Sequence, residues 1–119
     1  MHAFIIEDDY LISQSIQDLL TDLGFTEFSF ASSEDAAIAG ANGETFDLIT
    51  ADSRLLPGDG LRAVEAICVG RDVPVIFVTG YAAELKDRIH GSLASAPIVD
   101  KPINADAFRT AVRQVLGKG

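Results

Sequence analysis

The chain has 119 residues, of which 48% are hydrophobic, and it contains a single cysteine. This length and composition predict one compact domain over residues 1–119, and no apolar run approaches the roughly 20 residues of a membrane span. The formal net charge of −9 excludes nucleic acid and anionic membrane as expected partners, because both require basic surfaces.

The N-terminus and the cysteine content both favour the cytoplasm. The sequence MHAFIIEDD lacks the basic segment and long apolar stretch of a secretory signal, and Cys68 has no second cysteine for an internal disulfide. The acidic charge suits a cationic ligand or a basic partner. The alternative explanation for the acidic charge is that it keeps a small protein in solution.

Short apolar or β-branched runs alternate with amphipathic stretches along the whole chain. The runs predict strands at 3–6, 27–30, 46–51, 74–79 and 97–99. The amphipathic stretches predict helices at 11–24, 32–43, 60–70, 81–91 and 104–117. Strict alternation predicts an α/β fold with a parallel sheet between helices, and five units in this length favour the flavodoxin-like order 2-1-3-4-5.

Two of the predicted helices have distinctive features in the sequence. The second begins after Ser32 and Ser33, and Asp35 stands three residues after Ser32, as in a capping box. The fourth, at 81–91, has only two apolar anchors, so it is expected to be a weak helix.

Charged and hydroxyl side chains follow the predicted strands at their carboxyl ends. They are Glu7, Asp8 and Asp9 after the first strand, Asp52 after the third, Thr79 after the fourth, and Lys101 with Pro102 after the fifth. The order 2-1-3-4-5 makes strands 1 and 3 neighbours, and ligands in such folds bind at that switch point. Crowded carboxylates either have raised pKa values or are compensated by a cation. A site with few protein oxygen ligands, which keeps waters and adds phosphate oxygens, suits Mg²⁺. A carboxylate at this edge is a candidate nucleophile towards phosphorus.

Each of these residues also has a purely structural explanation. Asp9 can cap the first helix, Asp52 can simply end a strand, Thr79 can cap a turn, and Lys101 can be a solvated surface charge. The placement of all four on one edge of one sheet favours a functional site.

The pattern resembles the receiver domain of two-component response regulators, and the resemblance covers the whole chain. In that family an acidic pair follows strand 1, the phospho-accepting Asp ends strand 3, a Thr or Ser ends strand 4, and Lys-Pro follows strand 5. The matching residues here are Glu7 with Asp8, Asp52, Thr79, and Lys101 with Pro102.

The resemblance implies that Asp52 takes a phosphoryl group from a histidine kinase or a histidine phosphotransfer protein. It implies Mg²⁺ as the cofactor, held by Asp8, Asp52 and the backbone carbonyl of Arg54, with Glu7 acting through water. Lys101 would pair with the phosphoryl oxygens.

The same resemblance assigns Thr79 a hydrogen bond to the phosphoryl group and a cis bond to Lys101-Pro102. It implies a phosphoacceptor switch and not a conventional enzyme, although the domain can catalyse its own phosphorylation and dephosphorylation. A downstream protein effector and either a monomer or a phosphorylation-dependent dimer follow from the same resemblance.

Two positions depart from the usual receiver pattern. Pro57 comes five residues after Asp52 where most receivers have it four residues on, so the loop is expected to take an altered turn. The aromatic switch residue three positions before the lysine is replaced by Ile98, which puts the usual aromatic rotation in doubt.

The segment PVIFVTGY (74–81) resembles the PFxFATG[Y/G] signature of the FATGUY subgroup of receivers from alphaproteobacteria. In that subgroup Gly80 would free the backbone around the switch, and Tyr81 would move when Thr79 is drawn to phosphate. A half-packed ring at a helix start is the alternative explanation for Tyr81. The subgroup is associated with general stress signalling.

Arg54 and Tyr81 hold the two positions that, in receivers, flank the path of the hydrolytic water, so slow loss of the phosphoryl group is expected. An aspartyl-phosphate phosphatase would have an Asp in place of Arg54, and an FMN module would have a phosphate-cradling loop after strand 1. A degenerate receiver that works without phosphorylation and a phosphate sink for a shared kinase stay open as alternatives.

Overall fold

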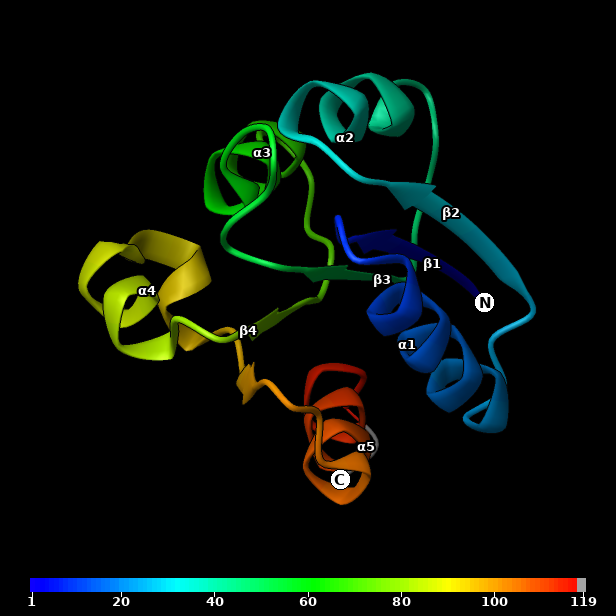
Figure 1. Ribbon diagram of the computed structural model, residues 1–119. Helices are drawn as coiled ribbons and strands as arrows, with labels where there is room; N and C mark the ends of the chain where they lie inside the picture. Colours follow the sequence, from blue (N-terminus) through cyan, green and yellow to red (C-terminus); the bar gives the residue numbers. More distant parts are fainter. Residues whose placement is uncertain (118–119) are drawn as a thin grey trace.

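A computed structural model describes residues 1–117 as a five-stranded parallel sheet in the order β2-β1-β3-β4-β5 (Figure 1). The strands are β1 (His2–Ile6), β2 (Glu27–Ala31), β3 (Leu48–Ala51), β4 (Val75–Thr79) and β5 (Ile98–Asp100). The helices are α1 (Tyr10–Asp22), α2 (Glu34–Ala41), α3 (Gly60–Ile67), α4 (Ala82–Arg88), the 3-10 helix η1 (Gly91–Ser95) and α5 (Ala105–Val115). This is the flavodoxin-like fold that the sequence predicts.

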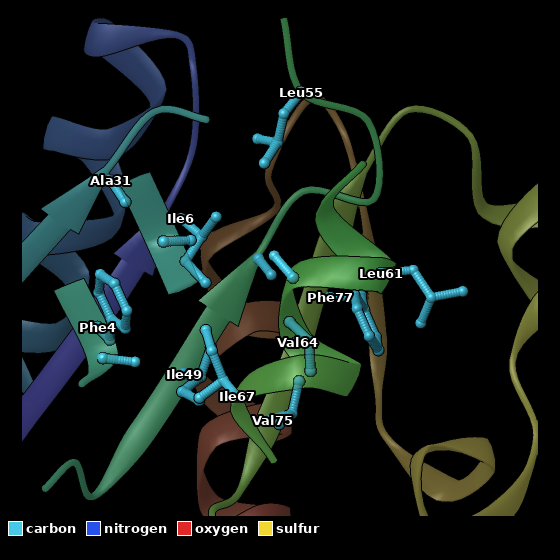
Figure 2. Packing of buried hydrophobic residues seen from close by; sticks show 14 of the residues in the cluster. Phe4, Ile6, Ala31, Ile49, Leu55, Leu61, Val64, Ile67, Val75 and Phe77 are labelled. Atoms are coloured by element: carbon cyan, nitrogen blue, oxygen red, sulfur yellow. The ribbon is translucent and has the colours of Figure 1, made fainter. Parts of the chain in front are cut away.

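The sheet separates two clusters of buried apolar side chains. Helices α1 and α5 cover one face, and α2, α3 and α4 cover the other (Figure 1). Figure 2 shows the second of these clusters, in which Val64 and Ile67 of α3 pack with side chains of β1, β3 and β4. Among residues 1–117, no helix is both long and apolar enough to cross a membrane.

The central strands are recognisable in the sequence because both of their faces are buried. Every residue of β3 and β4 is buried, as are the last four residues of β1. A parallel strand covered on both faces reads as a continuous apolar run. The predicted third strand begins two residues too early, because Phe46 and Asp47 precede β3.

The predicted capping box of the second helix is wrong. Ser33, which has extended backbone angles, is the N-cap, and its hydroxyl accepts a hydrogen bond from the amide of Ala36. Asp35 therefore falls at the second helical position, whereas a capping box requires the third. Asp9 caps α1, because its carboxylate accepts hydrogen bonds from the amides of Leu11 and Ile12. The helix-capping explanation for this residue is therefore confirmed.

Helix α4 is shorter than predicted and has few apolar contacts. It ends at Arg88, and the chain continues through η1, which the sequence pattern does not indicate. Leu85 is the buried residue of α4, and Ile89 at its C-terminus is half-buried. Packing therefore contributes less to the position of α4 than to that of the other helices.

One buried hydroxyl lies within the sheet without a hydrogen bond. Thr50 pairs with Ile5 and Ile76 in the strand register, so its side chain lies on the face covered by α1 and α5. It is 1% exposed, and Oγ1 has no hydrogen-bond partner among residues 1–117. A buried hydroxyl in this position destabilises a fold by about 1–3 kcal/mol.

Thr50→Val is therefore expected to raise the free energy of unfolding by about 1 kcal/mol, because it exchanges the hydroxyl for a methyl group of similar size. Urea unfolding followed by circular dichroism measures the change. Thr50→Ser is the matched control: it keeps the hydroxyl, removes the methyl group and lowers stability. A loss of stability in Thr50→Val would show that the hydroxyl is satisfied in solution.

Candidate functional site

Three acidic side chains meet where β1 and β3 end side by side. The strand order makes these two strands neighbours, and the amide of Asp52 donates to the carbonyl of Ile6 at 3.0 Å. Carboxylate oxygens of Glu7, Asp8 and Asp52 all lie within 4.8 Å of one another. Glu7 and Asp52 are buried, whereas Asp8 is exposed, so the cluster opens to solvent on one side.

The ammonium of Lys101 bridges two of these carboxylates. Its Nζ lies 2.7 Å from Oδ2 of Asp52 and 2.9 Å from Oε1 of Glu7. The backbone amide of Lys101 donates to the carbonyl of Thr79 at 3.0 Å, which fixes the start of the segment after β5. The bond between Lys101 and Pro102 is cis, in agreement with the resemblance.

Burial and charge crowding shift the protonation of the cluster. Burial raises the pKa of Glu7 to about 7, against the opposing effect of the Lys101 ammonium and with a further rise from Asp52. Burial alone would lower the pKa of Lys101, but its hydrogen bonds to Asp52 and Glu7 raise it above the ordinary value. The acidic cluster is thus incompletely compensated by a single ammonium.

The donor set fits Mg²⁺. Three carboxylates in a half-open cluster supply hard oxygen ligands and leave room for waters and for phosphate oxygens, which is the coordination that Mg²⁺ prefers. One oxygen of Asp8 accepts from the amide of Leu56 at 2.8 Å, and Asp52 accepts from the amide of Arg54 at 3.1 Å through Oδ1 in addition to its Oδ2 contact with Lys101. These bonds orient the carboxylates.

The loop from Ser53 to Asp59 carries the displaced proline. The Leu56–Pro57 bond is cis, and Leu56 projects into solvent with 86% of its surface exposed. The loop ends at Gly60, where a Cβ atom would lie 1.6 Å from the carbonyl oxygen of Asp52. A side chain at Gly60 would therefore displace the segment that carries Asp52.

Thr79 is completely buried at the end of β4, and its hydroxyl has two partners. Oγ1 lies 2.8 Å from Oγ of Ser53 and accepts from the amide of Tyr81 at 3.0 Å. The bond from the Tyr81 amide is the turn-capping contact that the structural explanation of Thr79 predicts. Ser53 is not recognisable as a site residue in the sequence, because a serine after a strand-ending Asp carries no distinctive pattern.

Arg54 and Tyr81, which the sequence places beside the site, contact each other. The Arg54 guanidinium lies 3.7 Å above the centroid of the Tyr81 ring, and it forms a two-point ion pair with Glu84 of α4. Glu84 raises the pKa of Arg54 and Arg54 lowers that of Glu84. Tyr81 itself is 48% exposed, so its ring is partly free to move.

A second ion pair connects the same elements. Arg88 near the end of α4 lies 2.6 Å from Asp59, the N-cap of α3. Helix α4 is therefore attached to the loop after Asp52 at two points, through Glu84 and through Arg88. The sequence pattern does not indicate either pair.

The remaining predicted switch positions lie nearby. Gly80 follows Thr79, and a Cβ atom placed there would contact nothing within 4 Å, so steric crowding does not require glycine at this position. Ile98 in β5 is half-buried and packs against the cluster that contains Leu85 of α4. Gly80 thus lies between the end of β4 and the start of α4, whereas Ile98 lies within the sheet, paired with Phe77 of β4.

The fold and the site define a flavodoxin-like α/β domain with an acidic, Mg²⁺-compatible cluster and a lysine at the carboxyl edge of its sheet. The response regulator receiver domain model matches residues 3–113, and the chain belongs to this family. Receiver domains are phospho-accepting switches of two-component systems, and they bind Mg²⁺ at an acidic pocket.

The curated relatives are regulatory proteins. The chain is 28% identical over 116 residues to the regulatory protein VirG of Agrobacterium fabrum, with 97% of this chain and 46% of VirG covered. It is 35% identical over 80 residues to the C4-dicarboxylate transport regulator DctD of Rhizobium meliloti, with 66% of this chain and 17% of DctD covered. The chain thus spans less than half the length of either protein.

Solved structures place the chain near PhyR receivers. The receiver domain of Erythrobacter litoralis PhyR is 34% identical with a TM-score of 0.86, covering 98% of this chain and 89% of that one. Brucella abortus PhyR is 30% identical with a TM-score of 0.86, covering 98% and 48%. The fold also matches the receiver domain of a Pseudomonas aeruginosa sensor kinase, a structure with magnesium in its active-site cleft, at 21% identity, a TM-score of 0.78, and coverage of 98% and 97%.

Addition of Mg²⁺ is expected to stabilise the wild-type protein by relieving repulsion among the carboxylates. Free Mg²⁺ at about ten times its Kd adds about 1.4 kcal/mol, or roughly 5 °C in melting temperature. Asp8→Asn, which keeps an oxygen for the Leu56 amide, should abolish this rise. Thermal unfolding with Mg²⁺ and with EDTA measures it.

Asp9→Asn is the matched control, since asparagine also caps helices well and the neighbouring carboxylate is removed in the same way. It should retain the full Mg²⁺ response. Equal responses in Asp8→Asn and the wild type would contradict a metal site at this cluster.

Proposed function

We propose that the chain is a phosphorylation-operated switch in which Asp52 is the phosphoacceptor. The observation that carries the proposal is the placement of the Lys101 ammonium 2.7 Å from Asp52 inside an acidic cluster. A carboxylate oxygen of Asp52 attacks the phosphorus of a phosphohistidine in line. The phosphorus–nitrogen bond breaks and its electron pair stays on that nitrogen. The phosphohistidine ring carries a proton on its other nitrogen, so it leaves as neutral imidazole, and an acyl phosphate forms on Asp52.

Each neighbouring residue has a role in this proposal. Lys101 moves its ion pair from the Asp52 carboxylate to the incoming phosphoryl oxygens, and Thr79 donates a hydrogen bond to one of them. Asp8, Asp52 and the backbone carbonyl of Arg54 would hold Mg²⁺, with Glu7 acting through water. When bound, Mg²⁺ supplies charge neutralisation between the attacking carboxylate and the phosphoryl group.

The proposed output is a change at α4. Phosphorylation adds about −1.5 to −2 charges next to a loop that two ion pairs connect to α4. Because Leu85 is the buried residue of α4, a change in these pairs can shift the helix and the protein-binding surface formed with β5 and α5.

We further propose a role in general stress signalling, with a histidine kinase or phosphotransfer protein upstream and a protein effector downstream. Two observations support it. PhyR from Bartonella quintana, described as an anti-anti-sigma factor, is 28% identical over 98% of this chain, and another PhyR, 28% identical over 97% of this chain, is described as a stress response regulator. The 74–81 segment also resembles the FATGUY signature.

Incubation with acetyl phosphate and Mg²⁺ is expected to add one phosphoryl group to the wild-type protein, and none to Asp52→Ala. Intact-protein mass spectrometry measures the addition, and peptide mapping locates it. Asp9→Asn serves as the acidic control and should be phosphorylated like the wild type. An unmodified wild-type protein would favour the degenerate receiver that acts without phosphorylation.

The phosphoryl group is expected to persist for many minutes or longer, because the stacked Arg54 and Tyr81 side chains lie beside the path of hydrolytic water. Arg54→Ala and Tyr81→Ala should each shorten the lifetime, by roughly tenfold if the barrier falls by about 1.4 kcal/mol. The decay of the phosphorylated mass after removal of acetyl phosphate measures it.

Lys86→Ala, on the exposed side of α4, is the control and should leave the decay unchanged. A wild-type lifetime of seconds, or unchanged decay in both substituted proteins, would show that these side chains do not shield the acyl phosphate.

A further inference from the structure

Ser53 is a buried hydroxyl that follows the phosphoacceptor directly and has no role in the proposed chemistry so far. It is 2% exposed, and its Oγ lies 2.8 Å from Oγ1 of Thr79, which stands 26 residues later in the chain. Within residues 1–117 this is the single hydrogen bond of the Ser53 side chain. The contact therefore joins the loop that carries Asp52 to the end of β4.

The direction of this contact determines whether the proton of Thr79 is available to another acceptor. A hydroxyl has one proton and two lone pairs, and the amide of Tyr81 already occupies one lone pair of Thr79 at 3.0 Å. If Ser53 donates, both lone pairs are occupied and the one proton of Thr79 is available to another acceptor. If Thr79 donates instead, its proton is used up and the Ser53 proton lies buried without an acceptor.

We propose that Ser53 is a positioning residue, which donates its hydrogen bond to Thr79 and thereby directs the proton of Thr79 to a phosphoryl oxygen on Asp52. This inference rests on the proposed function, and it identifies the Ser53 hydroxyl as the donor that orients Thr79 for phosphoryl recognition. The residue next to Asp52 thus orients the hydroxyl that recognises the modification of Asp52. Every hydroxyl proton of the pair has an acceptor once the phosphoryl group is present.

The opposite role of Ser53 has the opposite consequence. A Ser53 that accepts the Thr79 proton would hold Thr79 away from the phosphoryl group, and its removal would strengthen phosphoryl recognition. Substitution of Ser53 therefore distinguishes the two roles by the sign of its effect.

Beryllofluoride, a phosphoryl analogue that needs no transfer step, is the probe, titrated at fixed saturating Mg²⁺ and followed by the amide NMR signal of Tyr81. Ser53→Ala is expected to weaken binding about fivefold, the loss of one hydrogen bond of about 1 kcal/mol. Ser53→Cys keeps the side-chain volume, but its thiol is a weak hydrogen-bond donor, so it should also weaken beryllofluoride binding. This variant controls for the cavity that Ser53→Ala leaves.

The double substitution separates positioning from a general effect on the loop. Thr79→Val is expected to weaken beryllofluoride binding about tenfold or more, and adding Ser53→Ala should cause no further loss, because Ser53 acts through the Thr79 hydroxyl. The thermal response to Mg²⁺ should be equal in all these proteins, which shows that fold and metal site are intact.

Unchanged or tighter beryllofluoride binding by Ser53→Ala would overturn the inference, as would a further loss when Ser53→Ala is added to Thr79→Val. Either result, with a wild-type protein that binds beryllofluoride and is phosphorylated, leaves the proposed function standing. A wild-type protein that does neither overturns both.

Discussion

The carboxyl edge of the sheet depends on one ionic interaction, in which the ammonium of Lys101 contacts both Asp52 and Glu7. Strand β4 lies between β3 and β5, so this lysine crosses the end of β4 to reach a carboxylate that follows β3. It is held there by its own amide, which bonds to the carbonyl of Thr79. Without this charge, the buried carboxylates would repel one another, and the proposed nucleophile would lack a partner for the phosphoryl oxygens.

The sequence predicts the architecture well because the central strands are buried on both faces. The runs that became β1, β3 and β4 are almost continuously apolar, and each is followed by an amphipathic stretch, which leaves few alternatives to a parallel sheet. Prediction is poorer where burial is weaker. Helix α4 was predicted to extend to residue 91, but it ends at Arg88 and gives way to η1.

The sequence predicts the site residues that lie at the carboxyl ends of strands. A parallel sheet brings all carboxyl ends to one edge, so the proximity of Asp8, Asp52 and Lys101 follows from the strand order. Side-chain pairs between loops follow no such rule. The bond from Ser53 to Thr79 and the ion pair from Arg54 to Glu84 join residues 26 and 30 positions apart, and only the packed structure reveals them.

The ion pair of Arg54 with Glu84, which attaches α4, differs in exposure from the pair of Lys101 with Asp52. Arg54 and Glu84 have about half of their side-chain surface in solvent, whereas Lys101 and Asp52 are largely enclosed. Dissolved ions weaken the attraction between exposed charges, and they affect enclosed pairs much less. This attachment of α4 therefore loosens as the salt concentration around the protein rises, while the Lys101–Asp52 pair at the phosphoacceptor site is little affected.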